Sequence, residues 1–475
     1  MSAALSEPTL LESSRVISEG VVSEGGRTPG SHGFEAGPPP PVRHTFRFEE
    51  GRVDPDALRV VRKLVAAGFE AYIVGGAVRD LLLGRTAKDF DIATSARPED
   101  VKRVFRHNCR IIGRRFRLAH VYFAYGGRTY EVATFRRNPG EREGTEGDEE
   151  SEDLLIRSDN AFGIAHEDAL RRDFTINALF YDHDHSTILD WTSGMADVER
   201  RIIRTIGQPE VRFREDPVRI LRAIKFAARL GFELSDEVYS AIVAHRDDLA
   251  RAARPRVFEE VLRLLRGGAA RRSIWLAWDT GALAVVLPEL AAYLDDMESS
   301  GDGRALGALD AIDRMTAERG APPDDAVLLA TLLREPIREW TQGARNREEW
   351  RASLDEKLAE MGERLAITRR ISETLARLYS GEARLRGGRV GGFLATPLGP
   401  LALDFAKITA AADDAPATHR AWLDAVQLPV SRADERTKGA AEDRRPADPR
   451  SESRSSDRER PARSAHRAGT RVHRF

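Results

Sequence analysis

The sequence predicts an α+β protein, in which a small mixed-sheet domain is followed by helices and both ends of the chain are disordered. Short β-rich runs alternate with helical patterns between residues 52 and 135, and apolar residues recur mostly at helical spacing from about residue 210 to 430. Residues 1–44 and 431–475 carry little periodic hydrophobicity, which is typical of disordered chain. With 475 residues, 41% of them hydrophobic, the chain is long enough for several cores.

Glycine and proline mark the ends of the expected elements in the sheet domain. Gly68 and Gly84 are placed to end helices, and Gly126-Gly127 separates two β-rich runs as the turn of a hairpin. A proline near the first turn favours a helix start at the third helix. In chain order we expect a helix at 52–68, a strand at 69–74, a turn and helix at 75–84, a strand at 89–94, a helix at 95–105 and a hairpin at 118–135.

Changes in composition divide the chain further. Residues 138–153 are acidic and without apolar side chains, which predicts a mobile insertion. One β-structured segment is expected around residues 186–195, within an otherwise helical region. The predicted divisions are a disordered leader at 1–44, a sheet-containing head at 45–182, an all-helical neck at 183–255, a helical body at 256–430 and a disordered, net basic tail at 431–475.

Several classes of protein have no support in this sequence. No apolar run is long enough for a membrane span, and the single cysteine, Cys109, allows neither an internal disulfide nor a cysteine-based zinc site. This usage fits a reducing cytoplasm. No P-loop and no GxGxxG motif is present, and we interpret Asp-His-Asp-His at 182–185 as an exposed turn and not a metal site.

The segment VGGAVRDLLLGRTAKDFDIAT, residues 74–94, brings two kinds of anion chemistry together. Asp89 and Asp91 lie two residues apart in a predicted strand, so both carboxylates point to one face, where oxygen ligands at this spacing suit Mg²⁺. Two aspartates at this spacing, without further motifs, are more often surface residues at the end of a strand than metal ligands. Here, however, Gly75-Gly76 ends a strand and opens a helix, so backbone N–H groups face the same region, and Arg79 follows one turn later.

The second hairpin strand supplies a third carboxylate. Glu131 is expected in a strand of the same sheet and is a candidate to complete the metal site, although an exposed polar position in an alternating strand is an equally good interpretation. Arg136, at the end of that strand, is a further phosphate candidate.

The order of four motifs resembles one known family. GGAVRDLLLG with DFDIAT, then EVATFR, RRDFTINAL and REDPVRILRA are similar to the bacterial poly(A) polymerase and CCA-adding tRNA nucleotidyltransferase family, over about residues 45–290. The resemblance implies that Asp89 and Asp91 hold two Mg²⁺ ions, with ATP as a substrate and an RNA 3′ end as the acceptor. The acceptor that the resemblance implies is the 3′ end of single-stranded RNA, with tRNA as the alternative.

The resemblance also implies how the nucleotide is recognised. Asp173 would accept from the ribose 2′-OH, Arg172 would pair with a phosphate, and Asn177 would share the face of Asp173 one helical turn on. Asp216 and Arg219 would hydrogen-bond the edge of the incoming base, with no nucleic-acid template. On the residues alone, Asp216 is equally an N-cap ahead of Pro217.

The segment ahead of RRDFT, with its asparagine and Phe-Gly, resembles poly(A) polymerases more than CCA-adding enzymes. Ser158 departs from the acidic residue common there. The basic tail would bind the phosphate backbone of RNA, or it only keeps the chain in solution. We therefore expect a template-independent polynucleotide adenylyltransferase in the cytoplasm. The alternatives are a CCA-adding enzyme and, more remotely, an inactive RNA-binding protein of the same fold.

Overall fold

A computed structural model describes residues 38–113, 117–123, 128–137, 161–300, 303–386 and 396–413. Several predictions lie outside these ranges. They are residues 1–37 of the leader, the hairpin turn at Gly126-Gly127, the acidic insertion at 138–153, Ser158 and the basic tail at 431–475.

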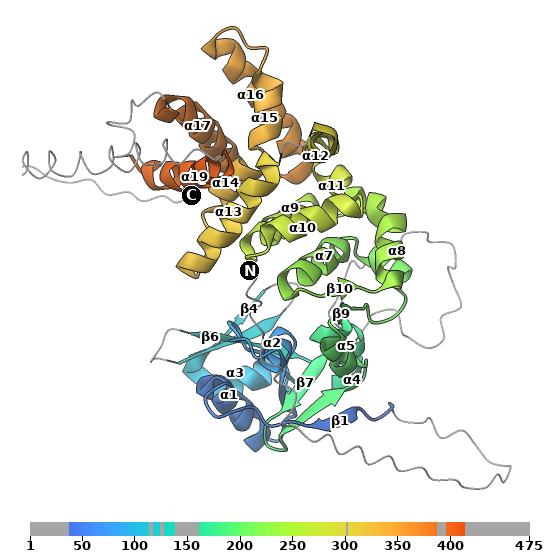
Figure 1. The fold of residues 1–475 in the computed structure, drawn as a ribbon. Helices are drawn as coiled ribbons and strands as arrows, with labels where there is room; N and C mark the ends of the chain where they lie inside the picture. Colours follow the sequence, from blue (N-terminus) through green and yellow to red (C-terminus); the bar gives the residue numbers. More distant parts are fainter. Residues whose placement is uncertain are drawn as a thin grey trace, which may run out of the picture. The chain divides into compact units, whose positions relative to one another are not determined.

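An eight-stranded mixed sheet forms the N-terminal part of the described chain (Figure 1). Its strand order is β1-β8-β7-β2-β3-β6-β5-β4. Only β3 and β6 pair in parallel, whereas every other neighbouring pair in this sheet is antiparallel. The strands are β1 (Val42–Thr45), β2 (Ala71–Val74), β3 (Asp91–Thr94), β4 (Cys109–Ile112), β5 (Leu118–Tyr122), β6 (Thr129–Thr134), β7 (Leu179–Asp182) and β8 (Thr187–Asp190). The predicted mixed sheet is confirmed.

The helices of this part are short and clearly bounded. Asp54 caps the first by accepting from the backbone N–H groups of Asp56 and Ala57, with Pro55 in its first turn. The elements are α1 (Pro55–Ala66), α2 (Gly76–Leu82), α3 (Pro98–Phe105), η1 (Arg106–Asn108), α4 (Ala165–Leu170), η2 (Thr175–Asn177) and α5 (Gly194–Arg200).

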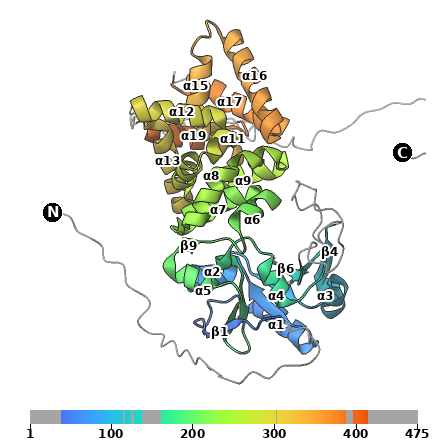
Figure 2. The ribbon, with the colours of Figure 1, turned by 90° about the vertical axis from the view of Figure 1, so that its right-hand side faces the viewer.

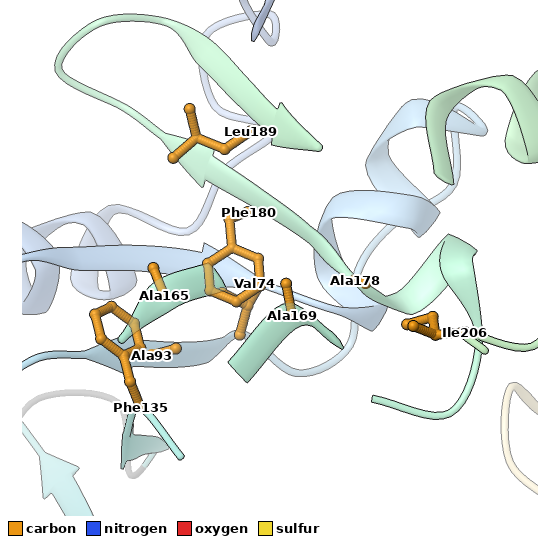
Figure 3. Packing of buried hydrophobic residues seen from close by; sticks show 9 residues of the cluster. All are labelled: Val74, Ala93, Phe135, Ala165, Ala169, Ala178, Phe180, Leu189 and Ile206. Carbon is orange, nitrogen blue, oxygen red and sulfur yellow. The ribbon is translucent and has the colours of Figure 1, made fainter. Parts of the chain in front are cut away.

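One buried cluster anchors the segment that follows α4. Figure 3 shows Phe135 and Phe180 among small side chains of adjacent strands, with Ala165 and Ala169 of α4 packed against them. The rings of Phe135 and Phe180 are 6.4 Å apart. Because α4 is fixed to the sheet in this way, the RRDFTIN segment directly after it is held beside β2 and β7. The cluster consists of Val74, Ala93, Phe135, Ala165, Ala169, Ala178, Phe180, Leu189 and Ile206.

Two predicted boundaries need correction. Residues 42–44, predicted to belong to the disordered leader, form most of β1, which pairs with β8 at the edge of the sheet. The sheet itself continues to Asp190, beyond the predicted end of the head at residue 182. The edge strand Val-Arg-His-Thr is mostly exposed, so it lacks the apolar alternation from which strands are predicted. The β-structured segment expected around residues 186–195 is confirmed, as strand β8.

Helices dominate the described part of the chain between residues 209 and 413, as predicted (Figure 2). Besides β8, the segment predicted as an all-helical neck holds two-residue strands that pair in parallel, β9 (Ile202–Ile203) and β10 (Glu233–Leu234). The helices are α6 (Pro209–Glu215), α7 (Val218–Leu230), α8 (Asp236–His245), η3 (Arg246–Arg251), α9 (Arg254–Arg266), α10 (Ala270–Asp279), α11 (Ala282–Val286), α12 (Pro288–Ser300), α13 (Arg304–Arg319), α14 (Asp325–Leu332), α15 (Arg334–Thr341), α16 (Arg347–Leu365), α17 (Arg369–Arg386) and α19 (Gly399–Ala412).

In the described ranges, none of the helices is both long and apolar enough to cross a membrane.

Candidate active site

Asp89 and Asp91 lie on the same side of the chain, as the sequence predicts. The strand begins at Asp91, two residues later than expected, but alternation extends back to Asp89. Phe90 and Ile92 are buried, at 7% and 1% exposure, whereas Asp89 and Asp91 are exposed. Both carboxylates therefore face away from the core, as a shared cation site requires.

Glu131 stands next to Asp91 on the neighbouring strand. Because Ile92 of β3 is in register with Val132 of β6, Asp91 and Glu131 occupy adjacent positions of this parallel pair. Glu131 is exposed between buried neighbours, so it shares the face of Asp91. On the other side, Nε2 of His120 in β5 lies 3.6 Å from Oε1 of Glu131.

Neighbouring negative charges act on the Asp91 carboxyl. Protein atoms around the Asp91 carboxyl raise its pKa, and the negative charges of Glu131 and Asp89 raise it further, while Arg172 opposes them. Clustered negative charge of this kind is relieved by a bound cation. Within the described part of the chain, no three His, Cys, Asp or Glu side chains are close enough to hold one metal ion together. The Asp89–Asp91 pair still fits Mg²⁺, which usually binds through one or two carboxylates and keeps several waters.

The glycine bend adjoins this carboxylate pair. Val74, the last residue of β2, is the antiparallel partner of Asp91, and Gly75 follows immediately. Gly75 has φ +71° and ψ −130°, a conformation that L side chains rarely adopt, and its N–H donates to the Leu179 carbonyl at 3.1 Å. A Cβ on Gly75 would stand 3.0 Å from Nη1 of Arg172. Next, Gly76 opens α2, whose first-turn N–H groups have no partner within the helix.

The Arg79 side chain is buried next to this bend, with Nη2 at 3.5 Å from where a Cβ on Gly76 would lie. Its guanidinium is only 3% exposed, donates to Asp80 at 2.7 and 2.9 Å and to the Asn177 side chain, and lies over the Phe226 ring at 5.2 Å. Burial lowers the pKa of Arg79, and Asp80 opposes that shift. The sequence indicated an arginine that reaches an anion at the helix start, whereas in the structure its donors are directed to protein groups.

The two other predicted phosphate arginines lie close to Asp168. Nη2 of Arg172 donates to Asp168 at 3.0 Å, and its Nη1 donates to the Asn177 carbonyl at 3.1 Å. The Arg172 guanidinium also stacks over Phe180 at 5.0 Å. Arg136 is 7% exposed, and its backbone N–H donates to Asp168 at 3.1 Å. Asp168, which sequence reasoning missed, therefore holds the Arg172 guanidinium and the backbone of Arg136.

Asp173 is bound by four donors. Oδ1 accepts from the Phe174 N–H at 2.9 Å and from Nδ2 of Asn177 at 3.1 Å, and Oδ2 accepts from Nε and Nη2 of Arg222 at 2.8 and 2.5 Å. Burial alone would raise the pKa of Asp173, but the charge of Arg222 and these hydrogen bonds lower it to about 2. The predicted proximity of Asp173 and Asn177 is confirmed.

Asp216 and Arg219 lie where α6 gives way to α7. Oδ2 of Asp216 accepts from Nη2 of Arg256 at 2.7 Å, and its carbonyl accepts from the Arg219 N–H at 3.0 Å. Nη1 of Arg219 donates to Glu215 at 2.9 Å and to the Arg212 carbonyl at 3.0 Å, and the side chain is largely buried. The positive charge of Arg219 also lowers the pKa of Asp173. Arg219, which is predicted to contact the base, therefore lies near enough to Asp173, which is predicted to contact the sugar, for its charge to act on it.

Sequence reasoning gave no role to three buried charges around these residues. Arg212 donates to the carbonyls of Arg171 and Arg172 at 2.8 and 2.7 Å, which ties α6 to the RRD segment. Asp80 pairs with Arg79, and Glu260 of α9 lies 3.9 Å from Arg222. The only signal in the sequence is that these charges fall on the apolar stripes of their helices, where a charge needs a partner.

Comparison with known families agrees with this arrangement. Residues 71–204 match the model of the "Poly A polymerase head domain", and residues 231–294 match the "Probable RNA and SrmB- binding site of polymerase A". The first match contains the carboxylates, the glycine bend and the RRD segment, and the second begins directly after α7.

Relatives extend the similarity over most of the chain. Poly(A) polymerase I of Haemophilus influenzae is 41% identical over 293 residues, 61% of this chain and 64% of that protein. Poly(A) polymerase I of Salmonella typhimurium is 37% identical over 345 residues, 70% of this chain and 72% of that protein. The crystal structure of the Bacillus stearothermophilus CCA-adding enzyme in complex with CTP has a TM-score of 0.58 and 28% identity, covering 79% of this chain and 82% of that one.

Proposed function

Because this chain belongs to the family of bacterial poly(A) polymerases and CCA-adding tRNA nucleotidyltransferases, we propose that it is a template-independent polynucleotide adenylyltransferase. It adds AMP from ATP to RNA 3′ ends and releases pyrophosphate. The observation that carries this proposal is the register of β2 and β3, which sets Asp91 beside Val74 and so beside the glycine bend.

Each group of residues has a separate task. Asp89 and Asp91 would hold Mg²⁺, and Glu131 adds a further negative charge beside them on the neighbouring strand. The backbone N–H groups at Gly75 and Gly76 receive the triphosphate, and Arg136 and Arg172 supply positive charge nearby. Bound Mg²⁺ would activate the RNA hydroxyl and stabilise the charge of the leaving pyrophosphate. The protein contributes position and fixed charge, as in other phosphoryl transfers.

Nucleotide selection involves the segment after α4 and the start of α7. Asp173 and Asn177 read the ribose 2′-OH, and Asp216 and Arg219 hydrogen-bond the base edge. Arg79, from its buried position, holds Asn177 and the first turn of α2 in place. A carboxylate accepts from the adenine amino group and a guanidinium donates to a ring nitrogen, so no template strand is needed.

These residue roles assign a separate function to each part of the chain. The segment at 45–182, extended by β1 and β8, is the catalytic head, 183–255 carries base recognition, and 256–430 together with the basic residues at 431–475 binds RNA. The enzyme acts in the cytoplasm, where ATP and nascent RNA are both available.

Incorporation of labelled nucleotides into RNA tests the proposal. Purified chain with Mg²⁺, ATP and an arbitrary single-stranded RNA should extend the 3′ end by many adenylates, and ATP should be preferred over CTP, GTP and UTP. Failure to extend any RNA with any nucleotide would leave the remote alternative, an inactive RNA-binding protein of the same fold.

The second candidate is a CCA-adding enzyme, which the likeness to the Bacillus stearothermophilus structure favours. A tRNA that lacks its last three nucleotides separates the two activities. With CTP alone, a CCA-adding enzyme adds two cytidines and stops until ATP arrives, whereas a poly(A) polymerase adds adenylates from ATP alone.

A further inference from the structure

Arg222 lies between two carboxylates that come from different parts of the chain. Its Nε and Nη2 donate to Oδ2 of Asp173 at 2.8 and 2.5 Å, and its Nη1 lies 3.9 Å from Oε1 of Glu260. Asp173 belongs to the segment after α4, Arg222 to α7 and Glu260 to α9. The guanidinium thus joins the predicted sugar reader to a helix that begins some 80 residues later in the chain.

Glu260 is itself held firmly. It is 4% exposed, and its two oxygens accept from Lys225 at 2.6 Å and from Arg263 at 2.7 Å. Burial lowers the pKa of Lys225, and the carboxylate of Glu260 opposes that shift. A buried carboxylate with two short, charge-assisted hydrogen bonds has a single orientation, so it presents a fixed negative charge to Arg222.

The Asp173 carboxylate has no acceptor position to spare. An ionised carboxylate offers about four lone-pair sites, and four donors already occupy this one. A ribose hydroxyl reaches Asp173 only if one of the donors shifts. The donors from Phe174 and Asn177 belong to the same segment as Asp173, whereas Arg222 is supplied by α7, a later part of the chain.

We propose that Glu260 is a positioning residue that, through Arg222, sets how Asp173 receives the sugar of the incoming nucleotide. The inference rests on the proposed function, since it assigns the sugar contact to Asp173. Loss of the Glu260 charge leaves Arg222 and Lys225 as neighbouring cations without their shared partner, and the guanidinium then moves relative to Asp173. Discrimination between ribose and deoxyribose should suffer more than nucleotide binding in general.

Equilibrium binding of ATP and of 2′-deoxy-ATP, both with Mg²⁺, provides the test. Wild-type chain should prefer ATP, and Glu260→Gln should reduce the ratio of the two affinities about fivefold to tenfold, the worth of one well-placed hydrogen bond. Arg222→Lys should act in the same direction, because an ammonium cannot donate twice in a fixed plane. A purely structural role would weaken both ligands equally and leave the ratio unchanged.

Glu259→Gln is the matched control. Glu259 lies on the same helix, is 42% exposed at its side chain, and pairs with Arg263 and Arg266. Its substitution removes the same charge from α9, so an equal fall in the ratio would overturn the proposal. An unchanged ratio in Glu260→Gln would also overturn it. If Glu260→Gln does not fold, Arg263→Gln provides the test, because Arg263 is half-exposed and its guanidinium orients Glu260. An unchanged ratio of affinities in Arg263→Gln would then overturn the proposal.

Binding keeps this inference separate from the proposed function. Wild-type chain that binds ATP but extends no RNA would refute the adenylyltransferase assignment, while the ratio of affinities would still test Glu260. Wild-type chain that extends RNA yet binds both nucleotides equally would refute the sugar contact at Asp173 and with it the role of Glu260, while the adenylyltransferase assignment would stand.

Discussion

Asp91 and Glu131 occupy adjacent positions on the parallel strands β3 and β6, one residue before the registered pair Ile92 and Val132. This is the only parallel pairing in the described eight-stranded sheet. Residues 40 positions apart are thereby placed side by side on one face. Protein atoms around the Asp91 carboxyl raise its pKa, and the negative charge of Glu131 raises it further.

Asp89→Ala and Asp91→Ala should each abolish nucleotide incorporation while the fold persists. The charge stabilisation that a bound cation provides is worth several kcal/mol, so a loss of about a thousandfold or more is expected. Both side chains are exposed, and their removal should leave thermal unfolding nearly unchanged. Incorporation assays with RNA-binding measurements check this, and activity like that of the wild type in either variant would remove that aspartate from the mechanism.

Glu131→Gln should lower activity about 10- to 100-fold, since a charged neighbour of the cation site is lost. The same substitution removes one of the charges that raise the pKa of Asp91. Protonation of Asp91 should then begin at lower pH, and the loss of Mg²⁺ affinity on acidification should shift to lower pH as well. Mg²⁺ titrations across the pH range measure this shift. Glu99→Gln, at an exposed carboxylate paired with Arg117, is the control that should change neither quantity.

Gly75→Ala should reduce both stability and nucleotide affinity. Its backbone conformation is unfavourable for alanine, at a cost of about 1–3 kcal/mol, and the new Cβ would press on Nη1 of Arg172 at 3.0 Å. Gly84→Ala is the matched control, because Gly84 also has positive φ, +69°, but nothing lies within 4 Å of the new Cβ. Denaturant unfolding should show a loss in both variants, and ATP binding a loss only in Gly75→Ala. Equal ATP affinity in the two variants would contradict a role of the bend in binding.

The sequence predicted the elements around the site well where a strong local signal exists. Gly68, Gly84 and Pro98 mark helix ends in the structure, and the run at 69–74 contains β2. Local patterns also placed Asp89 and Asp91 on one face. Strand β1 escaped prediction because an exposed edge strand lacks apolar alternation, and β9 and β10 because two residues contain no period.

Pairings between distant segments could not be predicted. Nothing near Arg79 in the sequence indicates that Phe226 and Asn177 will cover its guanidinium. The contact of Arg222 with Asp173 likewise joins α7 to a segment 49 residues earlier. Such partners are selected by tertiary packing, which a short motif does not encode. Arg79, predicted to bind an anion, therefore donates to protein groups in the structure.

Asp216→Ala should weaken the preference for ATP over CTP. If its carboxylate accepts from the adenine amino group, the loss of one charged hydrogen bond should reduce discrimination about tenfold or more. Arg256→Gln is the control, since Arg256 is exposed and a surface pair with Asp216 is worth about 0–1 kcal/mol. Incorporation from mixtures of ATP and CTP measures the preference. An unchanged preference in Asp216→Ala would leave this residue with only its structural contact to Arg256.

Asp173 should make the stability of the chain depend on pH in a defined window. Its pKa is about 2 in the folded protein against 3.8 ordinarily, so its contribution is fully present above pH 3.8 and is lost as the pH falls toward 2. A shift of this size corresponds to roughly 2 kcal/mol. Asp173→Asn should therefore be less stable than wild type at pH 7, and the difference should shrink below about pH 4.

Urea unfolding of both chains between pH 2.5 and pH 7 measures that difference. Asp247→Asn, at an exposed carboxylate for which substitution should change stability by no more than about 0.5 kcal/mol, is the control. A difference between wild type and Asp173→Asn that stays constant down to pH 2.5 would show that Arg222 does not stabilise the ionised carboxylate. A difference that grows on acidification would require a folded-state pKa above 3.8, contrary to the four donors around Asp173.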